Sequence, residues 1–461
     1  MSDWTVTQSP LPRRRPRALS PLREHLRDTF WFAPTAAMVG VFVVWLVAQE
    51  LDAALVRSLQ DDGDYGTVAE LLRFADDAKT VVSAVGSAMM TFIGVVFSIS
   101  LVAVQMASGQ FTPRVVRLFV RSRITKATFA VFLATFVLTL LVLTSYDSTP
   151  DPRVTTSVPL VQSVLTLFMV ALSLLLFVMY VNGTLRLMRV SHVIARIAAE
   201  SFRVAALMPA PADAEGVPAP ADGGRVPAPA DGGRVPGLGP VTAWVAHDAH
   251  AGVLRDVHIA RLVRVARKHG VVLRLVPRIG DFLVPGTPVL AVHGGQAPPR
   301  RVLRYALSVG VERTFHQDLG LGLRQLSDIA LRALSSAVND PTTAVQALDR
   351  IVQILAALSR RPLDAAVHRD RRGAVRLVQP VPGWTELVDL GFAEVRACAA
   401  GSPQVTRRML AGLDDLLLLA PPERREPLRR HRELLRQAVE RVAPTPADRA
   451  FALSPDRQGI G

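Results

Sequence analysis

A run of 34 residues without a charged side chain, at positions 80–113, constrains this chain more than any other feature. As an α-helix rising about 1.5 Å per residue, the run would be about 51 Å long. The hydrocarbon core of a bilayer is only about 30 Å thick, so such a helix crosses a membrane and extends beyond it. Polar side chains recur at every seventh residue, on one helix face: Thr91, Ser98, Gln105 and Thr112. We expect this polar stripe to contact protein or water rather than lipid.

Three further uncharged runs lie at residues 29–49, 127–146 and 154–185. Each is long enough for a transmembrane helix. Four such runs within the first 190 residues are atypical of buried helices in a soluble protein. The sequence therefore predicts an α-helical integral membrane protein with four transmembrane helices, followed by a soluble α+β cytoplasmic domain.

The charges beside these runs predict the orientation, because Lys and Arg accumulate on the cytoplasmic side. Basic residues precede the first run, separate the second from the third and follow the fourth, whereas acidic residues predominate in the loops 50–79 and 147–153. We expect both termini in the cytoplasm and residues 50–79 outside. The Arg- and Ala-rich composition suggests a GC-rich bacterium, and hence a multi-pass protein of the bacterial cytoplasmic (inner) membrane. A cleaved signal peptide is the alternative for the first run, but its apolar stretch is long for one.

The net charge of +14 does not indicate nucleic-acid binding, because no nucleic-acid motif accompanies it. Much of the basic charge lies in the predicted cytoplasmic loops, where anionic lipid headgroups are the simpler partner. Directly after Pro113, one face of an amphipathic segment carries Arg114, Arg117 and Arg121. Two interpretations remain open. In the first, the stripe lines a polar path and the arginines form a ring that attracts anions or binds lipid headgroups. In the second, the stripe packs helices together and the arginine side chains extend to the headgroups.

The chain divides into five predicted parts. Residues 1–28 form a basic cytoplasmic N-terminus, and residues 29–208 the transmembrane domain. Residues 209–239 form a disordered linker, in which VPAPADGGR occurs twice in tandem. Residues 240–445 form the cytoplasmic α+β domain, and residues 446–461 a C-terminal tail. Cys398 is the single cysteine, so an intrachain disulfide is excluded.

Within the α+β domain we expect a strand at 242–246, a short helix at 256–269 and a β-rich stretch at 271–292. Periodic apolar residues then predict five helices, at 319–338, 341–359, 384–400, 403–419 and 423–441. Pro341 should begin the second of these helices, with Asp340 as its cap.

The stretch 312–350 is dense in charge and contains a candidate ligand-binding or structural motif. Its members are Arg313, Asp318, Arg324, Asp328, Arg332, Asn339, Asp340 and Thr343. In one interpretation the helix beginning at Pro341 binds an anion at its N-terminus, with help from Arg332 and Arg313. In the other, Asn339 and Asp340 only cap the helix, and an Arg–Asp ladder ties neighbouring helices together.

Histidine and aspartate also gather at His247, Asp248, His250, Asp256 and His258. These residue types can bind metals, but their spacing matches no metal motif. The sequence contains no catalytic set such as a phosphate-binding glycine loop or a nucleophile elbow. We therefore expect no metal, no cofactor and no enzymatic activity.

Two stretches, FSISLVAVQMASGQFTPRVVRLFVR and RQLSDIALRALSSAVNDPTTAVQALDRI, resemble a bacterial family of predicted membrane proteins, domain of unknown function 2254. The resemblance covers roughly residues 28–430, and Asn339-Asp340-Pro341 with Thr343 is its most specific mark. It implies an inner-membrane protein with four N-terminal spans and a cytoplasmic C-terminal domain, and it implies no activity.

Two hypotheses of function follow. The first is a homo-oligomeric channel or transporter-like protein, because four helices are few for a transport pathway within one subunit. The second is a membrane-anchored sensor or scaffold, whose cytoplasmic domain binds a partner or an anionic ligand. Conductance after reconstitution separates the two.

Overall fold

The computed structural model describes residues 31–110, 123–146, 155–207, 238–303, 305–363 and 365–459. Of residues 107–110, 123, 187 and 188 it describes the backbone alone. The chain divides into two compact units that meet between His192 and Val193. The expected linker at 209–239 lies outside the described residues except for its last two positions.

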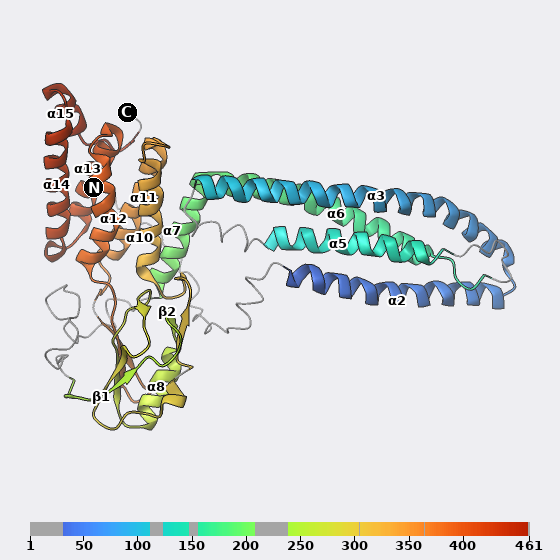
Figure 1. Ribbon diagram of the computed structural model, residues 1–461, viewed down its shortest axis with the longest axis horizontal. Helices are drawn as coiled ribbons and strands as arrows, with labels where there is room; N and C mark the ends of the chain where they lie inside the picture. Colours follow the sequence, from blue (N-terminus) through green and yellow to red (C-terminus); the bar gives the residue numbers. More distant parts are fainter. Residues whose placement is uncertain are drawn as a thin grey trace, which may run out of the picture. The chain divides into compact units, whose positions relative to one another are not determined.

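Four long helices make up the first unit: α2 (Phe32–Asp61), α3 (Tyr65–Gln110), α5 (Arg123–Thr144) and α6 (Leu160–Met188). They lie side by side as a bundle (Figure 1), and α5 contacts each of the other three. Each helix is long and apolar enough to cross a membrane. The prediction of four such helices followed by a domain of helices and strands is confirmed.

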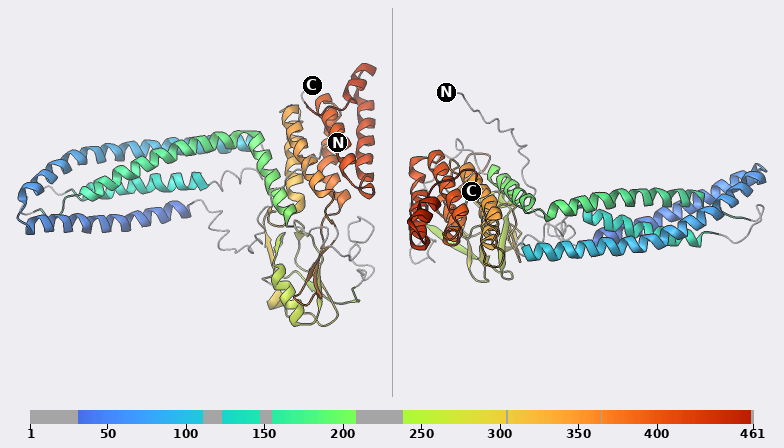
Figure 2. Two further views of the ribbon diagram at one scale, coloured as in Figure 1. Left: turned by 180° about the vertical axis from the view of Figure 1, so that it is seen from behind. Right: turned by 90° about the horizontal axis from the view of Figure 1, so that it is seen from above.

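One face of α3 packs against the bundle along almost its whole length. Its buried side chains recur at every seventh residue: Val68, Ala75, Val82, Met89, Val96 and Ala103. Such a repeat is typical of helices that wind around one another with a left-handed supercoil. With 46 residues, α3 is about 69 Å long, roughly twice the thickness of a bilayer core. Figure 2 shows how far it extends beside its neighbours.

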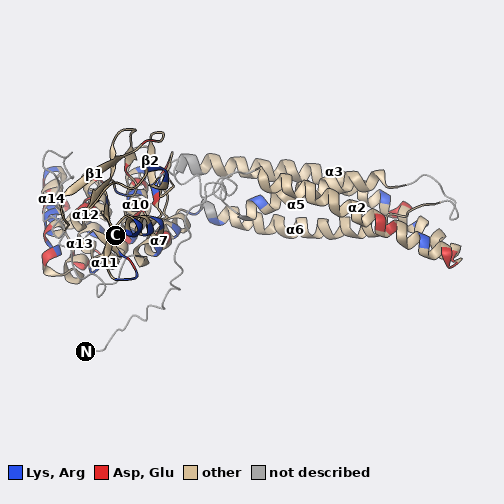
Figure 3. Cartoon of the chain, turned by 90° about the horizontal axis from the view of Figure 1, so that it is seen from below, with Lys and Arg blue, Asp and Glu red and all other residues tan. Residues whose placement is uncertain are grey.

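Residues 50–79 were expected to form a loop between the first two membrane helices, but all of them except residues 62–64 are helical. α2 continues to Asp61 and α3 begins at Tyr65, so residues 62–64 alone connect them. Gly63 has a φ of +76° in this turn, and Asp64 accepts a hydrogen bond from the Thr67 N–H (3.1 Å). The charge pattern favours a loop, but Ala, Leu, Glu and Arg are strong helix formers whether or not they are charged. Figure 3 shows the acidic residues gathered towards one end of helices that are uncharged over most of their length.

The carboxylate of Asp52 ties α2 to the beginning of α6. Its oxygens accept hydrogen bonds from the Val161 N–H (2.7 Å), the Gln162 N–H (3.3 Å) and the Gln162 side-chain amide (3.1 Å). The first turn of any helix leaves N–H groups without partners, and Pro159 at the start of α6 provides no capping side chain. Asp52 therefore acts as the N-cap of a helix that begins more than 100 residues later.

Two further contacts hold the same end of the bundle. The Trp45 indole N–H donates to the Ser145 hydroxyl (3.2 Å), which joins α2 to the end of α5. The Tyr146 and Ser163 hydroxyls lie 2.8 Å apart and join that segment to α6. Together with Asp52, these contacts fix the axial positions of α2, α5 and α6.

We predict that Asp52→Ala lowers the melting temperature of the detergent-purified protein. The substitution leaves the first N–H groups of α6 buried without an acceptor, and hydrogen bonds to a charged group contribute about 1.5–3 kcal/mol. Asp52→Asn keeps one acceptor oxygen and should cost less. Glu50→Ala is the matched control, because Glu50 is exposed and lies 3.8 Å from an equally exposed Arg57. Equal losses for Asp52→Ala and Glu50→Ala would contradict the capping role.

The second unit contains two β-sheets. The strands are β1 (Val241–Ala246), β2 (Gly252–Val257), β3 (Val272–Leu275), β4 (Phe282–Leu283), β5 (Pro288–His293), β6 (Leu307–Gly310), β7 (Ala366–Arg369) and β8 (Val375–Gln379). One sheet has the order β1-β5-β3-β8-β7 and the other the order β4-β2-β6. Among the strands that the structure describes, only the β3–β8 pairing is parallel. Helix α8 (Ile259–Lys268) contributes Leu262 and Ala266 to the core with Leu273 and Leu290.

The predicted strand at 242–246 and the β-rich stretch at 271–292 are confirmed. The helix predicted at 256–269 begins later, at Ile259, because Asp256 and Val257 belong to β2. The short strand β6 was not predicted, and neither were β2, β7 and β8. The arginines of these last three strands, such as Arg255 and Arg376, interrupt the apolar pattern that marks a strand.

Helices form the rest of this unit: α7 (Val190–Ala206), α9 (Arg300–Leu303), α10 (Leu319–Ala333), α11 (Pro341–Leu358), α12 (Trp384–Ala399), α13 (Pro403–Leu419), α14 (Glu426–Val442) and α15 (Pro446–Ala452), with a 3₁₀ turn at Pro422–Arg424. The five helices predicted from 319 onward are confirmed, although α10 ends five residues early. α7 approaches α10 very closely: a Cβ atom at Gly322 would lie 1.8 Å from the Ser201 hydroxyl oxygen. Glycine is therefore required where the two helices touch.

Candidate functional site

The polar stripe of α3 faces away from the other helices of its own chain. Thr91, Ser98 and Gln105 each follow a buried residue of the seven-residue repeat by two positions. Two residues correspond to about 200° around a helix, so the stripe lies opposite the buried face. All three side chains are exposed, and within the described residues none has a hydrogen-bond partner. The fourth predicted member, Thr112, lies outside the described residues.

Several other polar side chains of the bundle are hydrogen-bonded inside it. The Tyr180 hydroxyl donates to the Val96 carbonyl oxygen (3.1 Å) and also contacts Ser100. The Thr135 and Ser173 hydroxyls lie 3.1 Å apart between α5 and α6. A polar group without a partner in hydrocarbon costs several kcal/mol. The α3 stripe therefore differs from the polar residues that stabilise a single bundle, and it is the first candidate site.

The predicted basic face beside the stripe, Arg114, Arg117 and Arg121, lies outside the described residues. The structure therefore neither joins these arginines to the stripe nor separates them from it.

The second candidate site is in the other unit, where Arg313 and Asp318 form a two-pronged ion pair. The Arg313 guanidinium donates from Nε and Nη2 to the two Asp318 oxygens, at 2.6 and 2.7 Å. Asp318 is buried and also caps α10, because its Oδ1 accepts from the Gly320 N–H (3.1 Å) and the Leu321 N–H (3.0 Å). Charge-assisted bonds of this kind are the stronger ones. Asp318 thus fixes both the start of α10 and the loop that carries Arg313.

A glycine turn covers this ion pair. Gly280 has a φ of +97°, and a Cβ atom there would lie 2.7 Å from the Arg313 Nε and 2.8 Å from an Asp318 oxygen. A side chain at position 280 would therefore both strain the backbone and displace the pair. The close approach leaves little room for a ligand, so the arrangement favours a structural role.

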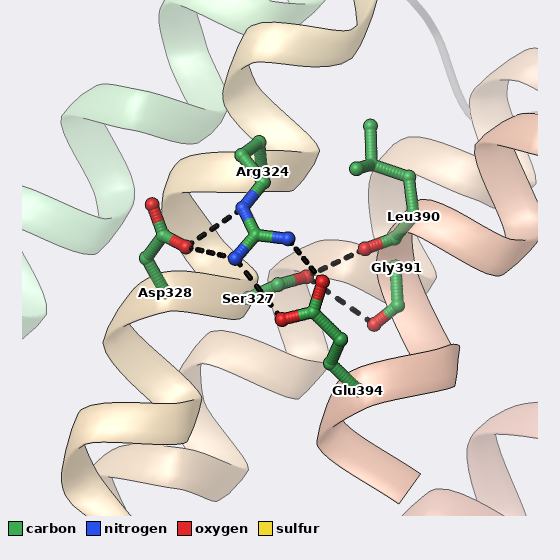
Figure 4. Close-up of polar contacts among 6 residues, drawn as sticks. All are labelled: Arg324, Ser327, Asp328, Leu390, Gly391 and Glu394. Carbon is green, nitrogen blue, oxygen red and sulfur yellow. Dashed lines mark hydrogen bonds and ion pairs between the residues drawn. The ribbon is translucent and has the colours of Figure 1, made fainter.

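Arg324 links α10 to α12 (Figure 4). Its guanidinium contacts Asp328 on its own helix (Nε–Oδ1, 2.7 Å) and makes a two-pronged pair with Glu394 on α12. These hydrogen bonds from Arg324 lower the pKa of the Glu394 carboxyl. Beside them, the Ser327 hydroxyl donates to the Leu390 carbonyl oxygen (2.9 Å). The predicted contact between Arg324 and Asp328 is confirmed, and its partner on α12 makes it a tie between helices.

The Asn339-Asp340-Pro341 motif forms the turn between α10 and α11. Asn339 has a φ of +47°, a left-handed conformation that Asn tolerates better than most residues. Asp340 caps α11 by accepting hydrogen bonds from the Thr343 N–H (3.0 Å) and the Thr343 hydroxyl (2.5 Å). The prediction that Pro341 begins a helix capped by Asp340 is confirmed.

The interpretation in which Arg313 supports an anion at Pro341 is wrong. Arg313 is bound at the N-terminal end of α10, whereas Pro341 follows the C-terminal end of the same helix. The 15 residues of α10 separate the two by about 22 Å. The first turn of α11 already faces the Asp340 carboxylate, which would repel an anion.

The histidine cluster does not form a metal site. His247 donates from Nε2 to the His250 carbonyl oxygen (2.9 Å), and His316 lies 3.6 Å from Asp256. The described parts of the chain contain no group of three or more His, Cys, Asp or Glu residues that could hold a metal ion.

Asp52 and Glu394 make contacts that join helices, but neither was singled out from the sequence. Asp52 carries a detectable signal, because it interrupts the apolar face of α2 on which Val41, Ala48 and Val56 are buried. Glu394 carries none, since acidic residues are common on exposed helix faces.

Comparison with known proteins agrees with this architecture. The model of one protein family, described as "Predicted membrane protein (DUF2254)", matches residues 27–415. The chain is also similar to Uncharacterized protein Mb1321c of Mycobacterium bovis and to Uncharacterized protein Rv1290c of Mycobacterium tuberculosis. Each is 28% identical over 462 residues, which cover 98% of this chain and 83% of the relative. No solved structure matches the chain.

We predict that replacement by asparagine lowers the melting temperature by different amounts at Asp318 and Asp340, the two aspartates that cap α10 and α11. Asp340→Asn should leave the melting temperature nearly unchanged because Asn caps well, whereas Asp340→Ala should cost about 0.5–2 kcal/mol. Asp318→Asn should lower it more than Asp340→Asn, because Asp318 also neutralises Arg313. Thermal unfolding of the purified variants measures all three. Equal effects of the two Asn substitutions would show that the Arg313 pair adds no stability.

Proposed function

This chain belongs to the DUF2254 family of predicted membrane proteins, and from that premise we propose that it is a homo-oligomeric channel or transporter-like protein. The pathway runs between subunits, along the exposed face of α3. The membrane is the bacterial cytoplasmic (inner) membrane, with both termini and the C-terminal unit in the cytoplasm and anionic lipid headgroups around the basic loops.

The observation that carries this proposal is the position of the stripe. Thr91, Ser98 and Gln105 are exposed on the side of α3 opposite its buried face. A row of hydroxyl and amide groups is unfavourable against lipid, so a second subunit or water has to cover it. Several subunits that turn this face toward a common axis would enclose a polar path.

A path through one bundle has little support. Large side chains fill the space between α3, α5 and α6, among them Phe92, Phe132 and Tyr180. The hollow that the described helices leave beside Phe92 and Phe132 measures about 50 Å³ and has an almost entirely apolar lining. That volume holds one or two water molecules, and it offers few groups to replace the hydration shell of an ion.

The second candidate is a membrane-anchored sensor or scaffold whose C-terminal unit binds a partner or an anionic ligand. The well-formed core of that unit, with its own sheets and helices, favours this alternative. In that case the α3 stripe serves only as an oligomer interface.

We predict that Gln105→Leu blocks flux through liposomes reconstituted with the protein, measured for K⁺, Cl⁻ and small neutral solutes. Membrane insertion and oligomer size should not change. Ser100→Ala is the control, because Ser100 lies on the same helix but contacts Tyr180 inside the bundle.

If the stripe only joins helices, Gln105→Leu should alter the oligomer or have little effect, since such hydrogen bonds average about 0.6 kcal/mol. Wild-type protein that passes no ion or solute would remove the channel proposal and favour the scaffold.

We also predict a labelling pattern for the orientation. Cysteine at Asp62, in a Cys398→Ser background, should react with a membrane-impermeant thiol reagent in intact cells, and cysteine at Asp231 should not. The native Cys398 is exposed and serves as a second test of the C-terminal unit, because it should react only after permeabilisation. The reverse pattern would place the termini outside.

A further inference from the structure

Helices α12 and α14 lie side by side and run in the same direction (Figure 1). The Trp384 indole N–H near the start of α12 donates to the Arg424 carbonyl oxygen (2.7 Å), just before α14 begins. Farther along both helices, Asp389 accepts from Arg430 and from the His431 Nε2 (2.7 Å). The earlier residue of α12 contacts the earlier residue beside α14, and the later residue contacts the later ones. The two helices are therefore parallel, and these contacts fix their register.

This register brings three arginines to one face. Arg396 follows Asp389 by seven residues, or two turns, about 10 Å farther along the same side of α12. Arg441 follows Arg430 by eleven residues, or three turns, about 16 Å along the same side of α14. Arg396 therefore lies beside the stretch of α14 between Arg430 and Arg441.

The arginines of this face outnumber the carboxylates. Asp389 is already shared by Arg430 and His431. In the part of the chain that the structure describes, neither Arg396 nor Arg441 forms an ion pair. Burial lowers the pKa of the Arg396 guanidinium, and the positive charges of Arg430 and Arg441 lower it further. The face is thus short of negative charge.

Arg396 also lacks a hydrogen-bond acceptor. It is half-buried, and its Nε–H is buried without a partner. A buried donor without an acceptor is destabilising, and the residues that the structure describes provide none here. By contrast, Arg436 on α14 is paired with both Glu433 and Glu440. Arg396 therefore differs from Arg436, whose guanidinium already has its carboxylates.

We propose that the face formed by Arg396, Arg430 and Arg441 binds a phosphate-bearing anion. A guanidinium presents parallel N–H groups that match two oxygens of a phosphate, and such pairs are the strongest arginine contacts. The phosphate would pair with the accessible Nη groups of Arg396 and balance the charges of Arg430 and Arg441. It can come from a soluble molecule or from a lipid headgroup. The site does not depend on the pathway proposed along α3.

The test uses the full-length protein in phosphatidylcholine nanodiscs, titrated with inorganic phosphate and with pyrophosphate by calorimetry. A second arm replaces part of the lipid with phosphatidic acid and counts retained lipids by native mass spectrometry. We expect binding in at least one arm, and the arm in which it occurs identifies the soluble or lipid source. Arg396→Gln should weaken it about tenfold or more, and Arg396→Lys should weaken it less.

Arg436→Gln is the matched control, an arginine on α14 that already has its carboxylates, and it should change binding by less than about twofold. Arg441→Gln is a second test variant, because Arg441 is exposed and its loss should not disturb folding. Failure of the wild type to bind in both arms, or equal losses for Arg396→Gln and Arg436→Gln, would overturn the site. Gln105→Leu should leave binding intact, so failure of the pathway and failure of this site are distinguishable.

Discussion

A polar group buried in the bundle is unfavourable unless it is hydrogen-bonded, and this requirement organises the first unit. Tyr180 donates to a carbonyl oxygen of α3, Thr135 meets Ser173, and Asp52 caps α6. Each contact joins two different helices and thereby fixes how far one is shifted along the other. Apolar packing alone would permit neighbouring helices to slide by a turn, whereas a capped helix start has one position. The polar contacts therefore specify the bundle that the apolar residues stabilise.

The same requirement explains why α3 has two distinct faces. The face with Met89, Val96 and Ala103 is complete, because α5 and α6 cover it. The face with Ser98 and Gln105 is incomplete, because it has polar groups and no partner within the described chain. One chain thus covers one side of this helix, and the side with Ser98 and Gln105 stays exposed. The C-terminal unit has a comparable feature at Arg396, whose buried Nε–H has no acceptor among the described residues.

Much of this fold could be predicted from the sequence, because its strongest signals are local. Uncharged runs predict the four long helices, and Asp340-Pro341 and Ser402-Pro403 mark the starts of α11 and α13. Signals that need a partner far along the chain were not visible. The cap at Asp52 depends on Val161, and the role of Glu394 depends on Arg324. The stripe could be assigned to one face of α3, but only the packing shows that this face is the outer one.

The long separation between Asp52 and the helix that it caps has a consequence for biosynthesis. Asp52 and Val161 are 109 residues apart, so the ribosome completes α2, α3 and α5 before the partner of Asp52 exists. Until α6 is inserted, the Asp52 carboxylate lacks the N–H groups of α6 from which it accepts hydrogen bonds. The last helix of the bundle to be made therefore supplies the hydrogen-bond donors for a carboxylate on the first.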